Sequence, residues 1–338
     1  MPDISNLHII LILIILVVSL FILSKSADLL VDNAVKLSKI WGLSEVVIGA
    51  TIVSLGTTLP ELAASVISAV QGNGEFSVGN AIGSCITNTS LILGVALLFG
   101  IIPVRKRQTQ KLTIFIIAAL LLTIPLVISY FVLGSFKIPQ WLGIVMLVIL
   151  PFYMAFLVIQ EKKYPVAKEE LEDEEKEIEE EKPKQKIIVL LLLLLVAALL
   201  IAVSASFLVD SAEVIALRIG IPDAIIASTL VAFGTSVPEL STAIAATKSK
   251  HGGLALGNVL GANILNILFV IGISSVLTVG GIVLSIEFVL INFIALALII
   301  ILFSIIAYNG KINKISKREG IILLIFYIAY VIANLLSI

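Results

Sequence analysis

The hexapeptide Gly56-Thr57-Thr58-Leu59-Pro60-Glu61 recurs later in the chain as Gly234-Thr235-Ser236-Val237-Pro238-Glu239. A shift of 178 positions aligns these two segments, and it also aligns residues 29–94 with 207–272 without a gap. Both hexapeptides lie within apolar stretches long enough to cross a bilayer. The sequence is therefore a duplication whose two copies each carry one glutamate in an apolar segment.

Composition excludes most classes of soluble protein. Of the 338 residues, 59% are hydrophobic and 13% are charged, with a mean hydropathy of +1.18. Soluble domains carry about 25% charged residues, so soluble enzymes, nucleic-acid binders and disordered chains are excluded. One cysteine and two histidines exclude a disulfide scaffold and disfavour thiolate or imidazole metal sites, haem and iron–sulfur clusters. The composition predicts a polytopic membrane protein.

Polar breaks between the apolar stretches predict an all-α integral membrane protein with ten transmembrane helices. The expected helices are 6–39, 44–71, 76–100, 110–133, 138–160, 187–218, 222–248, 253–278, 285–308 and 318–336. The first and sixth are too long for one perpendicular crossing, so we expect them to tilt or to project beyond the bilayer. The first is interpreted as an uncleaved span because no small-residue cleavage site follows it.

Lysine and arginine residues concentrate in alternate loops, which predicts the orientation. The basic side is assigned to the cytoplasm, with both termini extracellular and the protein in the plasma membrane. Three domains are expected: a first five-helix repeat (1–160), an acidic cytoplasmic linker (161–186) and a second five-helix repeat (187–338). The linker has few apolar residues to bury, so a hydrophilic connection is favoured over a cation sensor.

Five predicted spans separate equivalent points of the two copies. Because five is odd, the second repeat is expected to lie upside down relative to the first. Inverted repeats of this kind allow a transporter to present one site alternately to the two sides of a membrane. The duplication therefore predicts an alternating-access transporter.

Glu61 and Glu239 are each expected near the middle of a span. Ionisable groups at that depth are costly and mark functional sites. No lysine or arginine is expected at matching depth, and two carboxylates in a low dielectric repel strongly. We therefore expect a proton or a bound cation to neutralise the pair.

The residues around the two glutamates indicate the kind of cation. Pro60 and Pro238 lack an N–H, which leaves the carbonyl groups of Gly56 and Gly234 without their helical donors. Threonine and serine hydroxyls and asparagine amides add further oxygen atoms. Such hard ligands suit Ca2+ or Na+, whereas soft metals prefer thiolate or imidazole.

A second motif supplies the facing helices. Ser84 and Asn88 lie one turn apart, so both are expected to point toward Glu61. Asn266 is the equivalent of Asn88, and Ala262 stands where a second serine would be expected. Glycines spaced by four residues in the same segments are interpreted as surfaces for close helix packing.

The paired motifs G-T-T-L-P-E…G-N-A-I-G-S-C-I-T-N and G-T-S-V-P-E…G-N-V-L-G-A-N-I-L-N resemble the two alpha repeats of sodium/calcium exchangers. The similarity is strongest to prokaryotic members of the cation/calcium antiporter superfamily, and it covers nearly the whole chain. It implies a site in which two acidic residues hold Ca2+ and share Na+ sites, aided by hydroxyl, carbonyl and amide oxygens. The positions that match this site are Glu61, Glu239, Thr57, Thr235, Ser54, Ala232, Ser84, Asn88 and Asn266.

In this resemblance the threonines complete the Ca2+ site, and Ser54 and Ala232 contribute backbone carbonyls to flanking Na+ sites. Ala262 departs from the family because a serine ligand is common there, so one Na+ site is expected to be weaker. Asn266 is neutral where potassium-dependent relatives are acidic, which argues against K+ cotransport. Cys85 replaces a common asparagine and is assigned a structural role.

The expected activity is secondary exchange of Na+ for Ca2+, with extrusion of Ca2+. The chain contains no nucleotide-binding motif, so neither a cofactor nor ATP is expected, and the only partners expected are Na+, Ca2+ and lipid. An H+/Ca2+ antiporter of the same architecture is the nearest alternative. A cation channel and an intramembrane enzyme are the other classes considered, and no nucleophile or metalloprotease motif supports an enzyme.

Overall fold

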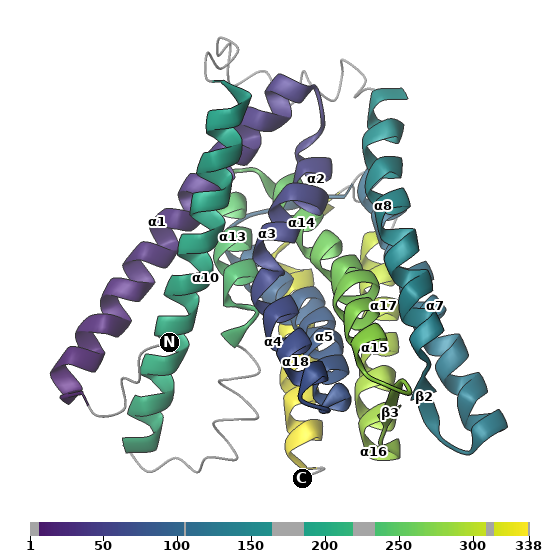
Figure 1. Cartoon of the computed structure of the whole chain (residues 1–338). Coiled ribbons are helices and arrows are strands. Elements are labelled where there is room, and N and C mark those ends of the chain that lie inside the picture. Colours follow the sequence, from purple (N-terminus) through teal and green to yellow (C-terminus); the bar gives the residue numbers. More distant parts are fainter. Residues whose placement is uncertain (1–6, 105, 164–185, 219–233, 309–313, 337–338) are drawn as a thin grey trace.

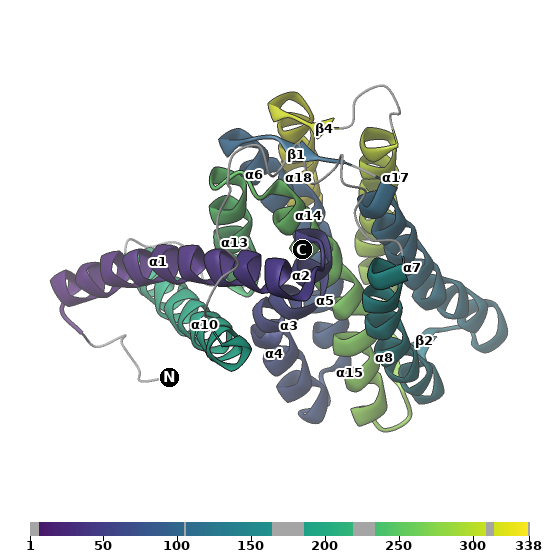
Figure 2. The ribbon, with the colours of Figure 1, turned by 90° about the horizontal axis from the view of Figure 1, so that it is seen from above.

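The computed structural model describes residues 7–104, 106–163, 186–218, 234–308 and 314–336. Two long helices, α1 (Ile9–Trp41) and α10 (Ile187–Arg218), pack along each other. They form a tilted layer beside the other helices (Figures 1 and 2). The layer brings the first helix of each predicted repeat together, although the two helices start 178 positions apart in the sequence.

The other helices of the first half are α2 (Glu45–Ile48), π-helical η1 (Gly49–Val53), α3 (Ser54–Thr57), α4 (Leu59–Val70), α5 (Gly74–Thr87), π-helical η2 (Asn88–Ile92), α6 (Leu93–Phe99), α7 (Lys106–Leu133) and α8 (Gln140–Lys163). Those of the second half are α13 (Val237–Lys248), α14 (Gly252–Leu265), π-helical η4 (Asn266–Ile271), α15 (Gly272–Leu277), α16 (Ile286–Phe288), π-helical η5 (Val289–Phe293), α17 (Ile294–Ala307) and α18 (Lys317–Leu336).

Within the described ranges, eight helices are long and apolar enough to cross a membrane. A ninth crossing is obtained if the segments Glu45–Thr57 and Leu59–Val70, which bend by 47° at their junction, count as one span. These nine lie where the sequence predicted them, with ends shifted by a few residues. The remaining predicted span, 222–248, is described only from residue 234 onward. The chain is a multi-pass helical membrane protein.

The duplication extends to the backbone. The shift of 178 positions carries α4 onto α13 and α5 onto α14, and the first and last positions of each pair coincide. It also aligns the first residues of η2 and η4, Asn88 and Asn266. π-Helical turns inside α-helices are frequent at functional sites. In both halves, the helix that carries the glutamate and the π-helical turn thus begin at equivalent positions.

The helices at the centre are those that carry the second motif. In the most apolar window of Gly74–Phe99, 72% of the residues are buried, and in that of Gly252–Leu277, 83% are buried. In α18 only 11% are buried, so its side chains mostly face outward. The repeated motifs therefore lie in the protein interior rather than on the lipid-facing surface.

Glycine permits close packing of α14 against the first half. A Cβ atom at Gly257 would lie 2.4 Å from the carbonyl oxygen of Val46, and one at Gly261 would lie 2.5 Å from the Cα of Ala50. Neither position has room for a side chain, because the obstructing atoms belong to the backbone. The predicted close-packing role of these two glycines is confirmed.

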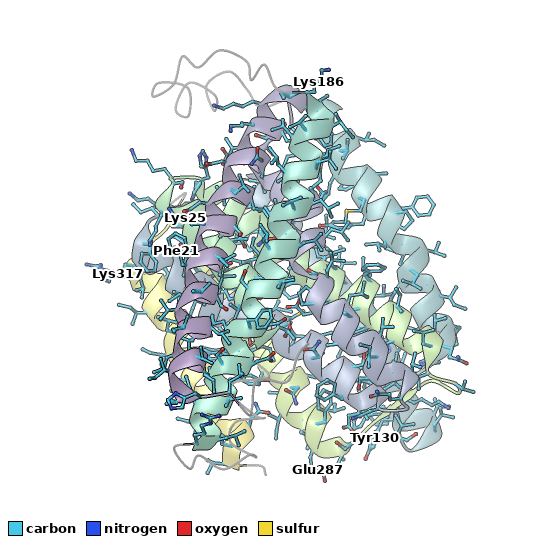
Figure 3. The ribbon with its side chains drawn as sticks, turned by 60° about the vertical axis from the view of Figure 1, so that its left-hand side comes forward. Phe21, Lys25, Tyr130, Lys186, Glu287 and Lys317 are labelled. Atoms are coloured by element: carbon cyan, nitrogen blue, oxygen red, sulfur yellow. The ribbon has the colours of Figure 1, made fainter. Side chains whose placement is uncertain are left out.

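Two short antiparallel ribbons join connections of the first half to connections of the second. β1 (Ile102–Pro103) pairs with β4 (Lys314–Ile315), and β2 (Phe136–Ile138) pairs with β3 (Ile282–Leu284). The β2–β3 ribbon lies at the lower end of the molecule in Figure 1. Tyr130 and Glu287 lie at this end, and Lys186 lies at the opposite one (Figure 3).

Candidate cation-binding site

Glu61 and Glu239 lie in the first turns of α4 and α13 and are fully buried. The two carboxyl groups are close enough to interact electrostatically. Within the described part of the chain, none of their four carboxyl oxygens has a hydrogen-bond partner, and no ion pair involves either residue. Buried charges are normally paired or bound to metal ions. The pair is thus a concentration of negative charge that requires a positive ligand.

Local sequence places both carboxylates at the start of a half-helix. Pro60 and Pro238 occupy the first turns of α4 and α13, where the missing N–H is tolerated. In the first half, α3 ends at Thr57 and the helix resumes at Leu59 with the 47° bend. The break exposes carbonyl oxygens at the end of one segment and N–H groups at the start of the next.

Amide and hydroxyl groups without partners surround this break. Asn88 and Asn266 are fully buried. The Oδ1 atom of Asn88, both amide atoms of Asn266 and the Oγ1 atom of Thr58 have no hydrogen-bond partner in the described residues. Buried polar groups are nearly always satisfied, so each exception needs an explanation. Cation binding through these groups would account for the unpartnered oxygen atoms among them.

The predicted threonines lie at the contact between the halves. Thr57 is buried, and its side chain lies beside the Glu239 carboxyl group. Ser84 is also buried, and its hydroxyl lies 3.5 Å from that of Ser236. Thr235 is half-buried and bonds to Asn80 of the first half. Residues from the first half thus face ligand candidates of the second, and the reverse also holds.

Backbone carbonyl oxygens of Ser54 and Ala232 were the two expected carbonyl ligands. The carbonyl oxygen of Ser54 accepts the Thr58 N–H at 2.9 Å and the Thr57 hydroxyl at 3.3 Å. A cation there would therefore compete with the Thr57 hydroxyl. Ala232 lies outside the described residues.

The two middle asparagines differ in their support. The Asn88 amide nitrogen donates to Asn263 Oδ1 at 3.1 Å, and Asn263 in turn donates to Thr89 at 2.8 Å. Cys85 is the repeat equivalent of Asn263, and its thiol contacts the Asn263 carbonyl oxygen at 3.5 Å. A thiol is a weak partner, so Asn266 receives no corresponding support. The structural role assigned to Cys85 agrees with its complete burial.

Sequence reasoning omitted four polar residues from the site: Thr58, Ser236, Asn80 and Asn258. Thr58 and Ser236 are equivalent positions of the hexapeptides, and Asn80 and Asn258 are equivalent positions of the second motif. Each contacts, or directly follows, a predicted ligand. Their recurrence in both halves was the signal that pointed to them.

The arrangement combines two carboxylates with neutral oxygen ligands. Such a set suits Ca2+ or Na+. Among the described residues, no group of three or more acidic, histidine or cysteine side chains could hold a metal ion. The cation would therefore be held by two charges and several neutral oxygens, and these ligands would come from both halves of the chain.

Comparison with known proteins agrees with this reading. The family model for "Sodium/calcium exchanger protein" matches residues 11–159 and 189–336. A membrane protein of Methanocaldococcus jannaschii, MJ0091, is 30% identical over 91% of this chain and 93% of its own length. The sodium/calcium exchanger MaX1 of Methanosarcina acetivorans is 29% identical, with coverages of 94% and 97%.

Solved structures of the sodium–calcium exchanger NCX_Mj share the fold. One of them superposes with a TM-score of 0.78 at 30% identity, covering 97% of this chain and 100% of the other. The same family model and the same fold therefore extend over nearly all of the sequence. The chain belongs to the sodium/calcium exchanger family of membrane antiporters.

Proposed function

We propose that this protein exchanges Na+ for Ca2+ by alternating access and extrudes Ca2+ from the cytoplasm. The observation that carries the proposal is the pair of buried carboxylates, Glu61 and Glu239, whose four oxygens have no partner among the described residues. Structures of NCX_Mj were obtained from crystals soaked with Na+ together with Sr2+ or Ca2+. The proposed ligands are the nine residues Glu61, Glu239, Thr57, Thr235, Ser54, Ala232, Ser84, Asn88 and Asn266.

We infer ten spans in two inverted repeats, 1–160 and 187–338, joined by the linker 161–186. The ribbons support the inversion. β1 and β3 follow the equivalent helices α6 and α15. The 28-residue helix α7 separates β1 from β2, and β2 pairs with β3. Equivalent connections of the two halves thus lie at opposite ends of the molecule, as an inverted duplication requires.

We propose that the protein lies in the plasma membrane. The end of the molecule that carries Lys186 would then face the cytoplasm. Lys162, Lys163 and Lys186 flank the acidic linker, and basic residues favour the cytoplasmic side. Both termini would then be extracellular. Accessibility of single cysteines introduced near Met1 and in the linker, in a Cys85→Ser background, tests this topology.

The nearest alternative couples Ca2+ movement to protons. Both mechanisms use the same carboxylates, because either Na+ or H+ can neutralise them when Ca2+ leaves. Isotopic Ca2+ uptake into proteoliposomes separates the two. An outward Na+ gradient at clamped pH should drive uphill uptake, whereas a proton gradient without Na+ should not. The reverse pattern would establish H+/Ca2+ antiport, and Ca2+ that only equilibrates under both gradients would indicate a channel.

A further inference from the structure

Two asparagines bridge the halves at the proposed site. Asn258 on α14 lies within 3.3 Å of the Thr57 hydroxyl, with its Oδ1 as acceptor. Asn80 on α5 accepts the Thr235 hydroxyl over the same distance. Asn80 and Asn258 are repeat equivalents, as are Thr57 and Thr235. Each asparagine therefore contacts the threonine of the opposite half.

The hydrogen-bond network fixes the direction of the Asn258 amide. The Thr242 hydroxyl donates to the carbonyl oxygens of Pro238 and Glu239 at 3.1 and 3.0 Å. A carbonyl oxygen can only accept, so the single hydroxyl proton of Thr242 is committed to these bonds. The Thr242 oxygen must then accept from Asn258 Nδ2, at 2.9 Å. Asn258 Oδ1 is left facing Thr57, whose hydroxyl proton it shares with the Ser54 carbonyl oxygen at the same distance of 3.3 Å.

The Asn80 amide is fixed in the same way. Its Nδ2 atom donates to the backbone carbonyl oxygen of Glu61 at 3.3 Å and to the Ser65 hydroxyl at 3.0 Å. The carbonyl cannot donate, so the atom facing it must be nitrogen. Asn80 Oδ1 therefore faces Thr235. Both networks begin at a carbonyl beside one site glutamate and end at the threonine of the other half.

The direction of these bonds matters because a hydroxyl has one proton and two lone pairs. A threonine that donates its proton to an asparagine directs its lone pairs elsewhere. A threonine that instead donated to a site carboxylate, such as Glu239 beside Thr57, would turn its proton into the site and its lone pairs away from the cation. An amide oxygen opposite the site favours the first arrangement.

We propose that Asn80 and Asn258 are positioning residues of the cation site. Each accepts the proton of a ligand threonine of the opposite half, so that the threonine oxygen presents a lone pair to Ca2+. The inference rests on the proposed function, in which Thr57 and Thr235 are Ca2+ ligands. It also gives each half a direct influence on the ligand geometry of the other.

The test is a double-mutant cycle on Na+-driven Ca2+ uptake in proteoliposomes. Asn258→Leu keeps the branched shape of the side chain but removes its acceptor, and Thr57→Val removes the hydroxyl. Asn258→Leu should raise the half-saturating Ca2+ concentration about fivefold, as for loss of one hydrogen bond. In the Thr57→Val background the same change should have less than about a twofold effect, because its target is already gone.

Asn80→Leu is the matched control, because it acts on Thr235 instead. It should raise the half-saturating concentration about equally with Thr57 or Val at position 57. Equal effects of Asn258→Leu in the two backgrounds would overturn the proposal. The proposal would also be overturned if Thr57→Val removed the effect of Asn80→Leu as fully as it removes the effect of Asn258→Leu. The coupling would then pass through the ion.

Two further measurements keep the result interpretable. If Asn258→Leu lowers the temperature of thermal unfolding in detergent, Asn258→Ala takes its place in the cycle under the same criteria. Glu239→Gln is measured in parallel. Wild-type flux in Glu239→Gln would reject the proposed cation site, whereas lost flux with an additive Asn258–Thr57 cycle would reject only the role of the asparagines.

Discussion

Replacing either buried carboxylate with its amide tests the proposed site most directly. Glu61→Gln and Glu239→Gln keep the side-chain volume but remove one of two negative charges. At a separation of about 4 Å and an effective dielectric constant of about 20, two unit charges interact by ~4 kcal/mol. The lost attraction to Ca2+ is then about 8 kcal/mol. The repulsion between the carboxylates is present with and without Ca2+, so it does not change this difference in binding.

A loss of about 8 kcal/mol corresponds to a Ca2+ affinity weaker by roughly 10^5- to 10^6-fold. We therefore expect each variant to abolish isotopic Ca2+ uptake into Na+-loaded proteoliposomes at micromolar Ca2+. Glu287→Gln is the matched control, since this exposed carboxylate lies at one end of the molecule (Figure 3), and its uptake should remain normal. Unchanged half-saturation and maximal rate in either site variant, with the protein folded, would refute the reasoning.

Three further outcomes are expected. Ala262→Ser should lower the Na+ concentration needed for half-maximal Ca2+ release, and Ser84→Ala should raise it more strongly, because it strips the remaining side-chain hydroxyl of the pair. A water can replace a missing hydroxyl at a cost of ~0–2 kcal/mol, so exchange should be weakened rather than lost; no change in either direction would show that these positions do not face the ions. Na+-driven Ca2+ uptake should be the same with K+ or an inert cation present, because Asn266 is neutral, and an absolute K+ requirement would contradict this. Gly257→Ala should destabilise the protein by about 1–3 kcal/mol, since its Cβ would meet the Val46 carbonyl oxygen. At Gly253 a Cβ would meet side-chain atoms, Val46 Cγ2 at 3.2 Å and Gln108 Nε2 at 4.0 Å, so Gly253→Ala should unfold close to the wild-type temperature.

Sequence alone predicted the membrane class, the apolar helices and the importance of Glu61 and Glu239. These features depend on local properties, because an apolar run of about 20 residues requires no partner to be recognised. An acidic side chain within such a run is costly wherever the helix lies. The duplication added further information, since a single shift of 178 positions relates the two hexapeptides. The break after Thr57 likewise followed from Pro60.

The tertiary structure decided which atoms face one another across the halves. The contacts between Thr57 and Asn258 and between Asn88 and Asn263 join residues 201 and 175 positions apart. Sequence spacing places a residue on its helix, but the rotation of that helix and its distance from a neighbour depend on the packing of the whole bundle. Close approach at Gly257 and Gly261 sets that distance for α14.

The difference between the two middle asparagines also required the tertiary structure. In the sequence, Asn88 and Asn266 are equivalent, and Cys85 reads as a small buried residue. In the structure Asn263 supports Asn88, whereas the repeat-equivalent position holds the thiol of Cys85, which contacts the Asn263 carbonyl oxygen. The sequence therefore determined the types of the candidate ligands and their duplication. Only the packed bundle determined which ligands are held in place, because hydrogen bonds depend on distances of a few tenths of an ångström.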